Sequence, residues 1–103
     1  MSSRFSNLPK VKGAEVTVTV SGTPVQGSDV LIPAGIEVTV LAHPDNTGRV
    51  SLAESSANAL NTATTSMLLE PGQSVSLLIK NFNNLYFDST VSGDKVRLFT
   101  EKE

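Results

Sequence analysis

The chain's single histidine lies in a segment that holds most of the residue types used in acid–base chemistry. Residues 43–55, HPDNTGRVSLAES, contain His43, Asp45, an arginine, a glutamate and two serines. A histidine acts as a general base when a carboxylate orients it and a nucleophile lies within hydrogen-bond reach, and Asp45 follows His43 closely. Serine is abundant throughout the chain, however, and no Gly-x-Ser-x-Gly elbow is present. The segment therefore favours a turn between two strands over a catalytic site.

The acidic residues offer a second kind of chemistry. Paired carboxylates catalyse glycoside hydrolysis, and acids at close alternating spacing hold calcium. Candidate acids lie in or beside expected loops, where acids are usually solvated: Glu54, Glu70, Asp88 and Asp94. No spacing brings two of them together, and neither DNTG nor DSTVSGD matches a calcium loop. The chain also lacks cysteine, a zinc-ligand cluster and a glycine-rich phosphate loop. We therefore expect a protein that is not an enzyme and has no cofactor or metal site.

The length and charge indicate one small domain with an uneven charge distribution. The chain has 103 residues and a net charge of −2, which argues against nucleic acid as a partner. Residues 1–12 hold three of the eight basic residues and none of the ten acids, so the rest of the chain carries −5. A basic arm ahead of an acidic body suits contact with an acidic surface.

Two further patterns concern the membrane and the compartment. No apolar run approaches the roughly 20 residues that a membrane span needs. The N-terminus has no apolar segment of the kind found in signal peptides. We therefore expect a protein that has no membrane partner and is assembled in a cytoplasm.

Alternating apolar and polar residues predict short strands separated by turns. Residues 16–20 alternate valine with threonine, and residues 36–42 alternate in the same way. The PDNTG sequence then turns the chain, and alternation resumes at residues 50–52. Further strands are expected at residues 30–32, 67–69, 75–79, 85–87 and 95–100. About seven or eight short strands predict an all-β fold, a small antiparallel β-sandwich or barrel that is jelly-roll-like or Ig-like.

Two segments fall outside the expected strands. Residues 1–13 are predicted to form a flexible basic N-terminal arm ahead of a single domain at residues 14–103. Residues 53–66 are nearly all small and polar, which indicates a long exposed loop with room for one helical turn near residues 57–60. Such a loop is a natural place for contacts.

Aromatic side chains in polar surroundings suggest contacts with a partner. Phe5 has no local core to join, and Phe82 lies between asparagines in an expected turn. Tyr86 and Phe87 are adjacent in a strand and so face opposite sides, which makes one of them a candidate for an exposed anchor. Together with the basic arm and the polar loop, these patterns predict a set of partner-binding residues: Arg4, Phe5, Lys10, Lys12, Glu54, Asn58, Asn61, Phe82 and Tyr86.

The order of turn motifs along residues 36–100 is a further pattern. A strand ending at Ala42 leads to an Asn-x-Gly turn and a polar loop; then come Leu-x-Pro-Gly-x-x-Val, Asn-Leu-Tyr and Gly-Asp-x-Val, at residues 46–48, 69–75, 84–86 and 93–96. This order resembles a group of small virion structural proteins of tailed bacteriophages. The chain departs from that group at residues 50–53, where Val-Ser-Leu-Ala stands in place of a strand such as Val-Tyr-Val-Gly.

The resemblance implies a non-enzymatic role in a phage particle. Its most specific form is a capsid decoration, or cement, protein that binds the outer surface of the head and stabilises the shell. The partners would be the major capsid protein or other virion proteins, the location the virion, and the protein a homo-oligomer, with a trimer as one option. The alternative is a fibre, collar or baseplate module that recognises another virion protein or a host-surface glycan, for which Asn81, Asn83, Asn84 and Tyr86 are candidate contacts.

Overall fold

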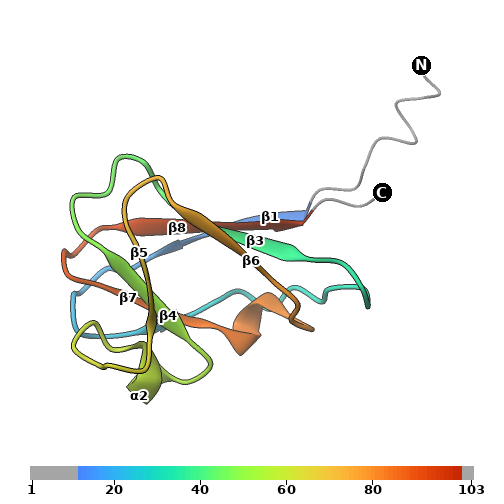
Figure 1. The fold of residues 1–103 in the computed structure, drawn as a ribbon, viewed down its shortest axis with the longest axis horizontal. Coiled ribbons are helices and arrows are strands. Elements are labelled where there is room, and N and C mark those ends of the chain that lie inside the picture. Colours follow the sequence, from blue (N-terminus) through green and yellow to red (C-terminus); the bar gives the residue numbers. More distant parts are fainter. Residues whose placement is uncertain (1–11, 101–103) are drawn as a thin grey trace.

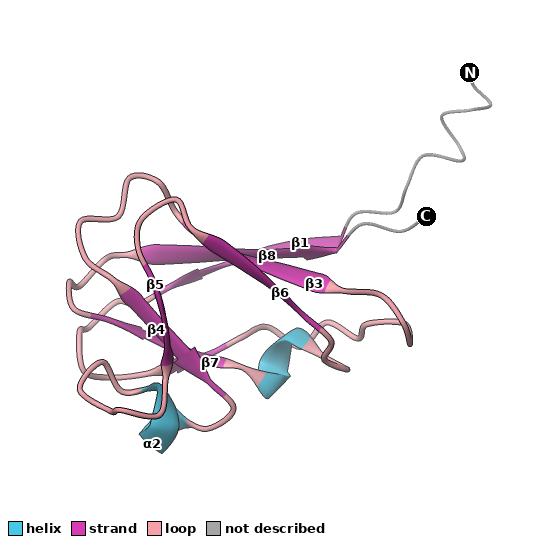
Figure 2. Cartoon of the chain, viewed as in Figure 1, coloured by secondary structure: helices cyan, strands magenta, loops and turns pink. Residues whose placement is uncertain are grey.

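A computed structural model of the protein describes residues 12–100 and is almost entirely β-structure. The strands form two antiparallel four-stranded sheets that face each other (Figure 1). The first sheet has the order β1 (Lys12–Thr17), β8 (Lys95–Thr100), β3 (Val38–Ala42) and β6 (Ser74–Leu77). The second sheet has the order β2 (Val25–Gln26), β7 (Tyr86–Ser89), β4 (Val50–Ala53) and β5 (Met67–Leu69). The described fold also contains two short helical pieces, α2 (Ser56–Ala59) and the 3₁₀ turn η1 (Phe82–Asn84) (Figure 2).

The path of the chain is that of a jelly roll. Every connection between consecutive strands crosses from one sheet to the other, except the hairpin from β4 to β5. Strands distant in sequence therefore become neighbours, as where β8 lies between β1 and β3. This double Greek-key path distinguishes a jelly roll from an Ig-like sandwich. The expected all-β sandwich is confirmed, and the strand order selects between its two variants.

The core lies between the sheets and follows the alternation in the sequence. In β3, Val38, Val40 and Ala42 are fully buried, whereas the residues between them are partly exposed. The second sheet contributes Val50, Leu52 and Phe87 from the opposite side. Because strand residues two apart share a face, a regular alternation is enough to assign the inner side of these strands.

Several strands differ from the sequence prediction in length or position. The strand expected at residues 16–20 runs from Lys12 to Thr17, and its first two residues belong to the segment predicted as arm. The run at residues 30–32 makes only an isolated bridge, between Leu31 and Asn81. The two-residue β2 has no alternation long enough to be detected. In each case, pairing with another strand sets where the strand begins and ends. The local sequence pattern carries no information about that partner.

Gly27 is buried where the chain passes beneath η1, and we expect Gly27→Ala to be clearly destabilising. A Cβ atom there would meet the carbonyl oxygen of Phe82, which is backbone and cannot rotate away. The free energy of unfolding should fall by about 1–3 kcal/mol, as measured by chemical denaturation. The matched control is Gly13→Ala, whose Cβ would lie 3.7 Å from the Leu98 carbonyl oxygen, an ordinary contact; it should change stability by no more than about 0.5 kcal/mol. Equal losses in both variants would contradict the argument.

Candidate functional site

The histidine segment forms a turn and lacks the geometry of a catalytic pair. The Nδ1 atom of His43 accepts a hydrogen bond from the backbone N–H of Asp45 at 3.0 Å. The Asp45 carboxylate lies 3.9 Å from the same nitrogen, and its side chain is 93% exposed. A carboxylate that orients a catalytic histidine accepts an N–H from the ring, but here Nδ1 is itself an acceptor. The turn predicted from the sequence accounts for these residues.

The same turn is fastened to the end of β8 by two side chains. The side-chain amide of Asn46 pairs with the backbone of Lys95, donating to its carbonyl oxygen and accepting from its N–H, both at 2.8 Å. The Asp94 carboxylate accepts the N–H groups of Thr47 at 3.1 Å and Gly48 at 3.0 Å. The Asn-x-Gly and Gly-Asp-x-Val motifs are therefore in direct contact with each other.

A second buried carboxylate, Asp88, joins three parts of the chain. One oxygen accepts the N–H groups of Gly22 at 2.9 Å and Ser89 at 2.8 Å, and the other accepts the N–H of Asn61 at 2.8 Å. The Ser89 hydroxyl donates to Asp94 at 2.7 Å, which links the two carboxylates in one network. Both acids are buried, so the expectation that they are solvated is wrong. They satisfy backbone donors that burial would otherwise leave unpaired.

The polar loop at residues 53–66 is largely fixed against the second sheet. The expected helical turn is present as α2, which packs on the outer side of β4 and β7. Ser51 donates to the Ala59 carbonyl oxygen at 2.6 Å, and the Asn61 side chain donates to the Ser89 carbonyl oxygen at 2.8 Å. Asn61 was predicted to contact a partner, but both its side chain and its backbone N–H form hydrogen bonds within the domain. Glu54 and Asn58 remain exposed.

The aromatic predictions divide between core and surface. Phe82 is fully buried, so its prediction as a partner-binding residue is wrong. The flanking asparagines explain why: Asn81 accepts the N–H of Asn83 at 2.9 Å, and Asn84 accepts that of Asn81 at 3.0 Å, which caps η1 and turns the phenyl ring inward. Tyr86 is half-buried and stays a predicted contact. The amide oxygens of Asn81 and Asn84, invoked for glycan contacts, already serve the chain's own backbone.

The basic arm is not part of the described structure. Arg4, Phe5 and Lys10 lie outside residues 12–100. Lys12 is the first residue of β1, where it is paired with Thr100, and its side chain is also outside the description. Their predicted contacts stay predictions.

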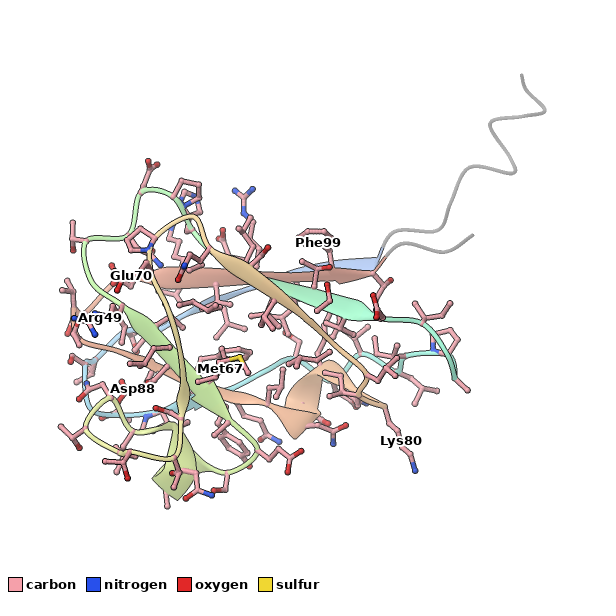
Figure 3. All side chains as sticks on the ribbon, viewed as in Figure 1. Arg49, Met67, Glu70, Lys80, Asp88 and Phe99 are labelled. Atoms are coloured by element: carbon pink, nitrogen blue, oxygen red, sulfur yellow. The ribbon has the colours of Figure 1, made fainter. Side chains whose placement is uncertain are left out.

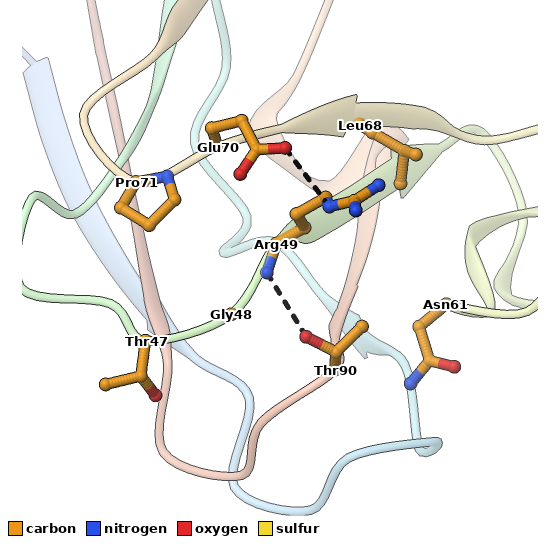
Figure 4. A pocket seen from close by; sticks show the side chains of 8 residues that line it. All are labelled: Thr47, Gly48, Arg49, Asn61, Leu68, Glu70, Pro71 and Thr90. Atoms are coloured by element: carbon orange, nitrogen blue, oxygen red, sulfur yellow. Dashed lines mark hydrogen bonds and ion pairs between the residues drawn. The ribbon is translucent and has the colours of Figure 1, made fainter.

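A polar hollow of about 430 Å³ lies beside the turn between β3 and β4 (Figure 4). Its main feature is an ion pair in which Arg49 Nε lies 3.1 Å from Glu70 Oε2. Both side chains are more than half exposed, so the pair contributes little to stability. Because the two charges neutralise each other and Asn61 is committed to the fold, this hollow has no unpaired charge to offer a ligand.

A second and more apolar depression opens between the edge strands β5 and β6, and we call it the β5–β6 groove. Its volume is about 370 Å³, and Figure 3 shows Met67 pointing from β5 toward β6. Met67 and Leu78 are 44% and 69% exposed, which is high for apolar side chains that line a depression. Glu54 and Asn58, both predicted as contact residues, lie at its rim. The remaining lining residues are Leu52, Ala53, Thr65, Leu77, Ile79 and Leu85.

The groove was not detectable from sequence, because Met67, Leu77 and Ile79 read as ordinary strand interiors. An edge position, where an inward-facing residue stays uncovered, is defined only by the pairing of whole strands. Exposed apolar side chains beside an open sheet edge are typical of a protein-binding surface. The β5–β6 groove is therefore the candidate functional site.

Two observations bear on metals and membranes. Within residues 12–100, no group of three or more histidine or acidic side chains is arranged to hold a metal ion. The same part of the chain contains no helix long and apolar enough to span a bilayer.

Comparison with known proteins gives no family. No family model matches the chain, and no curated protein matches it. One solved structure, from work describing Bacillus endospore appendages that form a novel family of disulfide-linked pili, aligns over 91% of this chain and 89% of that one. The identity is 17% and the TM-score 0.46. A likeness of this size carries no argument about function.

Proposed function

We propose that this chain is a structural protein of a tailed-bacteriophage particle, in its most specific form a decoration protein on the outer surface of the head. The observation that carries the proposal is the β5–β6 groove, where the apolar side chains of Met67 and Leu78 stay exposed between two open sheet edges. Such a surface suits a protein partner. The order of turn motifs along residues 36–100, which resembles that of small virion proteins, is the reason for proposing a phage particle as the assembly.

The architecture supports a scaffold that repeats over a surface. Asp88 and Asp94 are the carboxylates considered for a chemical role. Both accept hydrogen bonds from backbone N–H groups and hold the loops at one end of the sandwich. A rigid domain of this kind presents its groove in a fixed orientation. Many copies on one particle would multiply a weak contact into firm attachment.

The test is copy number, measured by quantitative mass spectrometry of purified particles that carry this sequence. A ratio to the major shell subunit near one, or a simple fraction of one, is expected for a protein that coats the head. A handful of copies per particle would replace the decoration role with the collar, tail or fibre alternative. Absence of the chain from particles would overturn the virion proposal altogether.

A further inference from the structure

We propose that the β5–β6 groove binds the N-terminal segment, residues 1–11, of a second copy of this chain. The inference goes beyond the proposed function, because it concerns how copies join one another whatever surface they coat. It rests on apolar character and complementary charge, and on the position of β1 at the sheet edge opposite the groove.

Both the groove and the segment carry several apolar side chains. The groove has buried Leu52 and Leu85 among its lining residues, and the exposed Met67 and Leu78 stand beside them. The N-terminal segment places Phe5, Leu8 and Val11 three residues apart, with a proline at position 9. In a polyproline II conformation, which has three residues per turn, these three side chains share one face. That face would fill the apolar part of the groove.

The charges are complementary at the rim. Glu54 is exposed beside the groove and forms no ion pair with any described residue, whereas Glu70 and Glu15 are paired with arginines. The segment carries Arg4 and Lys10 and no acid. A basic segment entering the groove would therefore bring a partner to an unpaired carboxylate, which guides association and fixes register.

The segment joins the first sheet at the edge opposite the groove. Lys12, Thr100, Val38 and Leu77 lie in one row across the first sheet, so β1 and the groove are on opposite edges, about 14 Å apart. To reach its own groove, the segment would have to cross the ends of β8 and β3. Eleven extended residues reach about 36 Å, so a neighbour's groove is within reach of the segment, whereas entry into its own groove would leave the wild type monomeric.

Such a contact is head-to-tail, because one segment enters one groove. Head-to-tail contacts close into a ring when the rotation between copies allows it. A dimer in which two copies exchange segments is the smallest closed assembly of this kind, and a trimer, one of the states expected from the sequence, is the next.

The experiment is a complementation test with two variants of the full chain. The segment variant carries Arg4→Glu and Phe5→Ala and keeps an intact groove; the groove variant carries Leu78→Asp and keeps an intact segment. Sedimentation velocity should show that the wild type associates with rising concentration. Each variant alone should associate at least about tenfold more weakly, because it loses an apolar contact. An equimolar mixture should restore a complex of one copy of each.

The control is Val20→Asp, an equivalent change at a side chain that is 56% exposed and outside the groove; it should associate like the wild type. Leu78 is also exposed, so thermal unfolding should show all variants folded. A wild type that stays monomeric, a groove variant that associates normally, or a mixture that fails to form the mixed complex would overturn the proposal. None of these results depends on copy number in particles, so the two proposals fail separately.

Discussion

Replacing Asp88 by alanine should lower the free energy of unfolding by about 3–5 kcal/mol. The side chain is fully buried and accepts three backbone N–H groups, from Gly22, Asn61 and Ser89. Alanine would leave these donors without a partner in a place that water reaches poorly, and each unsatisfied donor costs about 1–3 kcal/mol before relaxation. A domain of this size has about 5–15 kcal/mol of stability in total. The loss should therefore be visible as a large fall in the midpoint of denaturant unfolding.

Two further variants give a graded comparison. Asp88→Asn keeps one oxygen for Gly22 and Ser89 but turns an amide toward the N–H of Asn61, so it should lose about 1–3 kcal/mol. Asp45→Ala removes an acid whose side chain is 93% exposed, and should change stability by no more than about 0.5 kcal/mol. If Asp88→Ala were as mild as Asp45→Ala, the carboxylate would not be holding these loops.

Phe82→Ala should destabilise the domain by about 3–5 kcal/mol, through the cavity that it leaves in the core. The ring is fully buried, and its neighbours are held by the asparagine caps of η1, which limits how far the site can collapse. The measurement is thermal or denaturant unfolding followed by circular dichroism. The comparison is Tyr86→Ala on the outer face of β7, where the half-buried ring should account for about 1 kcal/mol.

The Phe82→Ala and Tyr86→Ala variants also distinguish the buried Phe82 of the structure from the exposed anchor that the sequence predicted. If Phe82 were an exposed anchor, its removal would weaken partner binding and leave the unfolding transition unchanged. The structure requires the opposite for Phe82. For Tyr86 it allows a binding effect with little loss of stability.

Regular alternation was sufficient to predict most of the sandwich. Buried positions alternate with more exposed ones along β3 and β8 without exception, and the PDNTG turn between β3 and β4 is encoded by residues whose backbone preferences suit it. These features are local, so a sequence shows them directly. The start of β1 at Lys12 is different, because it is set by pairing with β8, some eighty residues later in the chain.

The buried acids and the groove could not be predicted for a related reason. An aspartate at the end of a strand looks the same in sequence whether water or a backbone N–H occupies its oxygens. For Asp88, the deciding partners are Gly22 and Asn61, which belong to other loops. Met67 likewise becomes a surface residue only because β5 is the last strand of its sheet.

The carboxylate network also sets the point at which the domain can be completed during synthesis. The hydrogen bonds from Gly22 to Asp88, Gly48 to Asp94 and Asn61 to Asp88 join residues 66, 46 and 27 positions apart. Closing such loops costs entropy that local contacts do not return, which slows folding. A ribosome must therefore release the chain beyond Asp88 before Gly22 finds its acceptor, and beyond Asp94 before Gly48 does. Until then the hydrogen bonds of this network cannot join the loops at that end of the sandwich. The nascent chain is therefore expected to fold in a single late step.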